Sequence, residues 1–235
     1  MAQDGRQARW TKHNEERRTQ ILDAAIAVIE EQPAGAEFHV QQIAERAGLN
    51  RTVVYRHFTD RTDLDLAIRA RVLDDLTQQM LPALNLDGSI NEIIRRIIST
   101  YVDWTVEHPT LHTFAVQDTG GAVEFGLHRI ASALADLLEI AIAMLGADLD
   151  ADEEALVDPL AHGLVGAVFA TVLRWLSRKE RVPDAARLAE LLSMSVWNLL
   201  DGHIRRLGLE IDPDLPMAHL LNLPEELLAV DGDGA

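Results

Sequence analysis

Apolar residues recur at intervals of three and four along almost the whole chain, with breaks at proline, glycine or polar clusters. This spacing places apolar side chains on one face of an α-helix, whereas a half-buried strand would show strict alternation. No stretch of such alternation is found in the sequence, and segments such as 122–145 and 153–179 are far longer than ordinary strands. The chain is therefore predicted to be all-α.

The breaks define the limits of the predicted helices. Beyond a first helix from Glu15 to Glu31, two short helices are expected at Val40 to Arg46 and Arg51 to Phe58. A longer helix from Thr62 to about Leu81 ends before Pro82. Further helices are expected near 90–107, 110–117, 122–145, 153–179 and 184–208, with one more helical turn or two at 224–230.

The charge of the chain is unevenly distributed. The formal net charge of −17 argues against a nucleic-acid partner, but residues 1–72 carry 11 basic and 11 acidic side chains and are neutral. The remaining residues carry the whole excess of acid. Within the neutral part, basic residues cluster at 6–18 and again at 51–61. These clusters are two candidate cationic surfaces on a neutral domain joined to an acidic body.

The two short helices are joined by a turn that contains Gly48. Glycine readily takes the left-handed conformation that ends many helices, and Asn50 is a residue type that caps the next one. Two short helices joined in this way form a helix-turn-helix, whose second helix enters the major groove of DNA while the first crosses the backbone.

The run IAERAGLNRTVVYRHFTDRTDL, Ile43 to Leu64, closely resembles the DNA-binding signature of the tetracycline-repressor (TetR) family. The segment from Glu16 to Ile29 is similar to the first helix of that family. The resemblance is specific across residues 15–70, and residues 84–208 are compatible with it in helix number and length. It implies a ligand-responsive transcriptional regulator, most simply a repressor. Its expected parts are a helix-turn-helix domain (1–62), a ligand-sensing and dimerisation domain (63–210) and a C-terminal tail (211–235).

The resemblance also implies which residues meet double-stranded DNA. Arg51 and Arg56 would reach base edges or phosphates, Tyr55 and His57 would reach phosphates, and Arg61 stands where the family usually has a lysine on the phosphate backbone. A packing role for the Tyr55 ring stays open. The full expected set is Arg18, Asn50, Arg51, Thr52, Val53, Tyr55, Arg56, His57 and Arg61.

A homodimer on a palindromic operator is expected, because one recognition helix covers too few base pairs for useful specificity. The predicted helix 153–179 carries a stripe of small residues and is apolar on nearly all faces, which indicates burial on nearly all faces. The family dimerises through its last two large helices, and a core within one chain is the alternative. The expected interface is Gly163, Gly166, Ala167, Ala170, Leu188, Leu192, Ser195 and Leu199.

Aromatic and apolar residues with a few polar tips lie between these two regions, which is the composition of a small-molecule pocket. A small apolar or aromatic effector is expected there. The candidate residues are Tyr101, Trp104, His112, Phe114, Gln117, His128, Phe169 and Trp175. Each of them would equally suit an ordinary helical core.

Other classes of function have less support in the sequence. A helical protein-binding or scaffolding module is the main alternative, and the acidic net charge is its best argument. No phosphate-binding loop, nucleophile with a base or paired-carboxylate site is visible, so no enzyme and no cofactor are expected. Cysteine is absent, and Pro109 interrupts the helix between His108 and His112, so no metal site is expected. The N-terminus lacks the apolar core of a signal peptide, and the longest charge-free apolar run, Leu160 to Leu173, is short for a membrane span. A cytoplasmic protein is expected.

Overall fold

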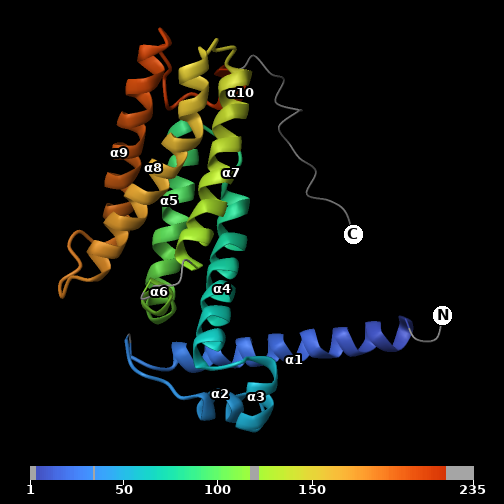
Figure 1. Ribbon diagram of the computed structural model, residues 1–235. Coiled ribbons are helices and arrows are strands. Elements are labelled where there is room, and N and C mark those ends of the chain that lie inside the picture. The colour runs from blue at the N-terminus through green and yellow to red at the C-terminus, as the bar shows by residue number, and fades with distance from the viewer. Residues whose placement is uncertain (1–3, 34, 117–121, 221–235) are drawn as a thin grey trace. The chain divides into compact units, whose positions relative to one another are not determined.

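The computed structural model describes residues 4–33, 35–116 and 122–220, and no β-strand occurs within these ranges (Figure 1). The helices are α1 (Asp4–Glu30), α2 (Val40–Arg46), α3 (Arg51–His57), α4 (Arg61–Met80), the short 3-10 helix η1 (Leu81–Ala83), α5 (Ile90–Glu107), α6 (Pro109–Val116), α7 (Ala122–Met144), α8 (Ala151–Leu176), α9 (Ala185–Arg206) and α10 (Met217–Leu220). The prediction of an all-α chain is confirmed.

Most helix limits agree with the predicted ones to within three residues. The exception is α1, which begins at Asp4 rather than Glu15 and so extends about three turns further toward the N-terminus. The short helix α10 was not predicted. The helical turn expected at 224–230 lies outside the described residues.

The chain folds into two compact units. The first comprises residues 1–75 and 107–126, and the second comprises residues 76–106 and 127–235. One boundary therefore falls inside α4, and α6 belongs with α1, α2 and α3. The domain limits 1–62, 63–210 and 211–235 divide the chain by expected function and stay a prediction.

The first unit is built on the buried face of α1, against which α2, α3 and α6 pack. Phe58, at the end of α3, is 1% exposed and is among the largest fully buried side chains in the described chain. Burial of one such side chain contributes about 1.5–3 kcal/mol. The core of this unit includes Ile21, Ala25, Val28, Ile43, Ala44, Val54, Phe58, Leu64 and Ile68.

The second unit is a bundle in which α5, α7, α8 and α9 run alongside one another, with α10 at one end (Figure 1). Side-chain caps start two of these helices: Asp150 accepts from the backbone N–H groups of Asp152 and Glu153, and Asp184 accepts from that of Arg187 at 2.8 Å. Such caps satisfy N–H groups that have no partner inside the helix.

Arg96 fixes the loop that leads into α5. Its guanidinium donates hydrogen bonds to the backbone oxygens of Ala83, Asn85 and Asp87, at 3.2, 2.8 and 2.9 Å. One side chain therefore binds three backbone oxygens of the connection between α4 and α5.

Candidate DNA-binding surface and effector cavity

The turn between α2 and α3 is closed by backbone hydrogen bonds. Gly48 has a φ of +66°, and its N–H bonds the carbonyl of Glu45 at 3.0 Å, while the Leu49 N–H bonds that of Ala44 at 2.8 Å. This pair of bonds is the Schellman motif, which ends a helix sharply and uses a residue in the left-handed conformation. The predicted role of Gly48 is confirmed.

Asn50 begins α3, as its residue type predicts. Its side-chain oxygen accepts a hydrogen bond from the backbone N–H of Val53 at 3.0 Å. The helix then buries Val54 fully and leaves Arg51 and Arg56 exposed. Of the other residues expected on the DNA side, Thr52 is exposed, and Val53, Tyr55 and His57 are half-buried. The solvent side of α3 is thus polar and basic, as a helix in the major groove requires.

Helix α1 holds both ends of this motif. The Gln20 amide donates to the carbonyl of Ala47 at 2.7 Å, at the turn. Arg18 donates to the carbonyl of His57 at 3.0 Å, and its guanidinium lies 4.3 Å from the centre of the Phe58 ring. A cation at the C-terminal end of a helix interacts favourably with the helix dipole. Arg18 therefore positions α3 from its end, and its predicted contact with DNA stays a prediction.

The imidazole of His57 lies in a cationic environment. Burial first, and then the charges of Arg17, Arg18 and His13, lower the pKa of His57 below its ordinary value of 6.5. The neutral form of the ring is therefore favoured at pH 7 in the free protein. A DNA phosphate beside it would favour the protonated form and raise this pKa again.

We expect operator affinity to rise as the pH falls from 8 toward 6, because a His57 that contacts phosphate takes up a proton on binding. The rise is at most about tenfold per pH unit for one proton. His57→Gln should flatten this dependence, measured as operator affinity at constant ionic strength. His128→Gln, on α7, is the matched control and should keep the slope of the parent. An unchanged slope in His57→Gln would show that His57 does not meet phosphate.

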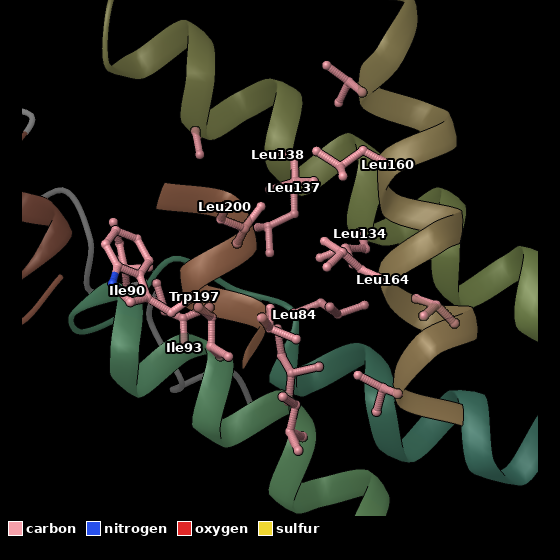
Figure 2. A pocket seen from close by; sticks show the side chains of 18 of the residues that line it. Leu84, Ile90, Ile93, Leu134, Leu137, Leu138, Leu160, Leu164, Trp197 and Leu200 are labelled. Atoms are coloured by element: carbon pink, nitrogen blue, oxygen red, sulfur yellow. The ribbon is translucent and has the colours of Figure 1, made fainter. Parts of the chain in front are cut away.

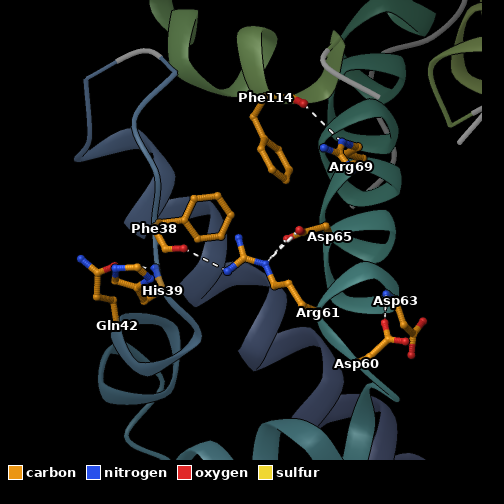
Figure 3. A network of polar contacts seen from close by, with 9 residues as sticks. All are labelled: Phe38, His39, Gln42, Asp60, Arg61, Asp63, Asp65, Arg69 and Phe114. Atoms are coloured by element: carbon orange, nitrogen blue, oxygen red, sulfur yellow. Dashed lines mark hydrogen bonds and ion pairs between the residues drawn. The ribbon is translucent and has the colours of Figure 1, made fainter. Parts of the chain in front are cut away.

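Arg61, at the start of α4, has partners inside the first unit (Figure 3). Its Nε donates to both carboxylate oxygens of Asp65 at 2.8 and 2.9 Å, and its Nη1 donates to the carbonyl of Phe38 at 2.9 Å. The guanidinium also lies 4.4 Å from the centre of the Phe38 ring. Arg61 thus ties α4 to the segment before α2, and the predicted phosphate contact would have to come from Nη2 or from the second N–H of Nη1.

The same cluster continues into α6. Phe38 meets Phe114 edge to face, with ring centres 5.4 Å apart. The guanidinium of Arg69 lies 4.6 Å from the centre of the Phe114 ring, and its Nε donates to the carbonyl of Phe114 at 3.3 Å (Figure 3). Cation–π and aromatic pairs of this kind each add about 0.5–1.5 kcal/mol. Together they join α4, α6 and the segment before α2.

A cavity of about 250 Å³ lies inside the second unit. The labelled side chains of Figure 2 point into it from α5, α7, α8, α9 and the loop before α5, and all except the Trp197 ring are hydrocarbon. Tyr101, Trp197 and His203 supply the polar atoms of the described lining. Burial raises the pKa of Tyr101, so its hydroxyl stays neutral. The cavity therefore suits an apolar molecule.

Two of the predicted ligand residues line this cavity. They are Tyr101 and Phe169, whose rings stack with centres 6.4 Å apart. Among the described residues, those that line the cavity do not include Trp104, His112, Phe114, His128 or Trp175. Gln117 lies outside the described residues. The sequence feature that corresponds to the cavity is a set of aliphatic residues on two helices. They are Ile90, Ile93, Ile94, Ile97 and Ile98 on α5, and Leu127, Leu134, Leu137, Leu138 and Leu145 on α7 or just after it.

The other candidates have different surroundings. Burial lowers the pKa of His112 to about 4, so this ring is neutral and belongs to the core of the first unit. The Trp175 indole donates to the carbonyl of Pro183 at 2.8 Å. His128 is exposed, and its Nδ1 lies 2.9 Å from Nε2 of His162 on α8. Trp104, His112, Phe114, His128 and Trp175 are not among the lining residues of this cavity, and their contact with an effector stays a prediction.

Comparison with known proteins decides the family. The model for bacterial regulatory proteins of the tetR family matches residues 21–68, which contain α2, α3 and most of the buried face of α1. An HTH-type transcriptional regulator of Mycobacterium tuberculosis is 30% identical over 210 residues, covering 87% of this chain and 86% of that protein. The chain belongs to the TetR family. It is a helix-turn-helix transcriptional regulator.

Solved structures of other transcriptional regulators share the fold. A regulator from Streptomyces coelicolor superposes with a TM-score of 0.62 at 20% identity, over 91% of this chain and 100% of that one. FadR of Bacillus subtilis, solved in complex with stearoyl-CoA, superposes with a TM-score of 0.54 at 17% identity, over 76% and 96%.

The helix α8 of this TetR-family regulator is apolar yet poorly covered. Within the described part of the chain, α8 is the one helix that is long and apolar enough to cross a membrane. A single helix of this kind is weak evidence of a membrane span, because the core helix of a soluble protein has the same length and composition. Only 22% of its most apolar stretch is buried. Gly163, Ala167 and Ala170 are exposed along it, and a Cβ added to Gly166 would meet nothing within 4 Å.

The positions predicted for a dimer interface on α9 divide into two groups. Ser195 and Leu199 are exposed, and Leu199 is 45% exposed despite its size. Leu188 and Leu192 are buried inside the second unit, and their contact with a second subunit stays a prediction.

Proposed function

We propose that this TetR-family regulator is a repressor that binds a palindromic operator as a homodimer and releases it when a small apolar effector fills the cavity. The cavity itself carries this proposal. Protein interiors are close-packed, with few voids larger than a water molecule. An apolar space of about 250 Å³ approaches the size of ordinary ligand pockets.

The lining favours an aliphatic effector over an aromatic one. Leucine, isoleucine and valine side chains dominate it, and they come from helices that surround the space along its length. An alkyl chain fills such a space without leaving polar groups unpaired. FadR of Bacillus subtilis, a member of the same fold, was solved with stearoyl-CoA, whose acyl chain is of this chemical class.

The surface of α8 and α9 supports the proposed dimer. A helix of such apolarity with most of its surface uncovered needs a partner, and its small side chains allow close approach of a second helix. Two recognition helices related by twofold symmetry would read two operator half-sites about 34–36 Å apart. We therefore assign the exposed small residues of α8, with Ser195 and Leu199, to the contact between two copies.

The helix α4 is the proposed link between effector and operator. It begins at Arg61, directly after the helix-turn-helix, and its last turns carry Leu76 and Met80, which line the cavity. An effector that binds one position of α4 better than another would shift the spacing of the recognition helices. A cytoplasmic location suits a protein with a DNA partner.

We expect effector and operator to weaken each other's binding by the same factor, of about 5- to 150-fold, which corresponds to a coupling of about 1–3 kcal/mol. Sequencing of the genomic fragments that the purified protein retains supplies the operator. A thermal-shift screen of saturated fatty acids and their coenzyme A thioesters supplies the effector. The effector's dissociation constant is then measured by calorimetry with and without saturating operator.

Random DNA of the same length is the control, and it should leave effector affinity nearly unchanged at moderate salt. Equal effector affinities with and without operator would refute the switch, even if the effector stabilises the protein.

A further inference from the structure

The chain after α9 turns back and packs against the start of α5. Gly208, with a φ of +77°, ends α9. The N–H of Asn91 donates to the carbonyl of Pro213 at 3.0 Å, and the N–H of Met217 donates to that of Gly88 at 2.9 Å. The Asn91 amide adds a hydrogen bond to Asp214 at 2.8 Å. Residues 211–217 are therefore attached at several points, and we call them the return segment.

The return segment places two apolar side chains in the wall of the cavity. Ile211 and Met217 both line it, and Met217 is 2% exposed. Leu215, between them, points to solvent and is 43% exposed. The backbone hydrogen bonds thus hold the segment with Ile211 and Met217 toward the cavity and Leu215 toward solvent.

Met217 lies at one end of the cavity. Along α5 the lining runs from Ile90 to Tyr101, about 16 Å at 1.5 Å per residue. The backbone bond to Gly88 places Met217 next to the Ile90 end, and Tyr101 with its stacked partner Phe169 marks the other. Ser89, which pairs with Pro216, is buried, so the return segment covers this end. Leu84, Leu86 and Ile90 are the neighbouring lining residues.

We propose that Met217 is the end stop of the effector cavity and sets the longest alkyl chain that this regulator accepts. The proposal rests on the proposed function, since it requires that an aliphatic effector binds here. The ligand class is a molecule with one linear saturated chain and a polar head that stays outside the apolar lining. The Met217 side chain occupies space that a longer chain would need, because a well-packed core has no room for both.

The test measures chain-length preference in the full-length protein. Octanoate, dodecanoate and hexadecanoate, each as free acid and as coenzyme A thioester, are titrated into the parent, Met217→Ala and Met217→Phe by calorimetry. Comparison of the affinities for acid and thioester shows which head group the protein binds better. Each further methylene that is buried raises affinity about fourfold. The ratio of hexadecanoate to dodecanoate affinity should therefore rise at least about tenfold in Met217→Ala, and the ratio of dodecanoate to octanoate affinity should fall by a similar factor in Met217→Phe.

Met144→Ala is the matched control. Met144 ends α7, is partly exposed and is absent from the described lining, so the same substitution there should leave the ratio unchanged. Helix content and thermal stability are recorded for every variant. Met217→Val, which removes less volume, gives the same direction if the alanine variant does not fold.

The outcomes separate this proposal from the proposed function. If alkyl chains bind the parent but neither Met217 variant changes the ratio of affinities between chain lengths, Met217 is not the end stop. The proposed effector class then stands. Failure of every chain to bind the parent, as acid or thioester, overturns the aliphatic effector and the end stop with it.

Discussion

Replacement of both Arg51 and Tyr55 by alanine is expected to abolish specific operator binding while the dimer and the helix content stay intact. Both side chains reach the solvent side of α3, where the Arg51 guanidinium lies 5.3 Å from the centre of the Tyr55 ring. Arg51 is exposed and Tyr55 is half-buried, whereas Val54 and Phe58 on the opposite side are buried in the core. Each lost base or phosphate contact weakens binding by about 1–3 kcal/mol. Operator affinity, measured by fluorescence anisotropy, should fall roughly 30-fold or more.

Arg187→Ala tests whether the loss is specific to α3. Arg187 is an exposed arginine of α9 whose guanidinium pairs with Glu190 at 2.7 Å, so its removal changes the net charge equally. We expect parental operator affinity in this variant. Parental affinity in the double variant would mean that α3 is not the recognition helix.

The replacement Gly166→Leu should dissociate the dimer without unfolding the subunit. A Cβ added at this position would meet nothing within 4 Å inside its own chain, and leucine favours a helix over glycine by up to about 1 kcal/mol. Overpacking at an interface costs about 1–3 kcal/mol, and twofold symmetry doubles this cost. The dimer dissociation constant, measured by sedimentation, should rise roughly 30-fold or more, and operator affinity should fall with it.

Ala143→Leu is the control for an added leucine. Ala143 is exposed on α7, outside the proposed interface, so the dimer should persist in this variant. If Gly166→Leu stays dimeric with normal stability, the contact between subunits does not use the small residues of α8.

The helix-turn-helix could be predicted because its determinants are local. The left-handed turn at Gly48 and the cap at Asn50 each depend on residues within five positions in the sequence. The bond from Arg61 to Phe38 shows the opposite case. Phe38 lies 23 residues away, and no local pattern indicates that an arginine at this position binds a backbone oxygen inside its own unit.

The early start of α1 was missed because residues 4–14 offer no repeated apolar face. Helical periodicity detects helices that pack, and this part of α1 is mainly polar. The cavity was missed for a related reason. An isoleucine on α5 that lines an empty space has the same sequence signature as one that fills a core, and the space exists only once several helices are assembled.

The placement of α6 in the first unit makes the DNA-binding module discontinuous in sequence. Glu30 of α1 lies 2.6 Å from His108, and Phe38 packs on Phe114, with Leu111 and Ala115 buried nearby. A chimera that grafts only the first 62 residues onto the sensor of a relative would set Glu30 and Phe38 against a foreign α6. Transfer of operator specificity between TetR-family proteins by domain exchange therefore requires that residues 108–116 travel with the recognition helix.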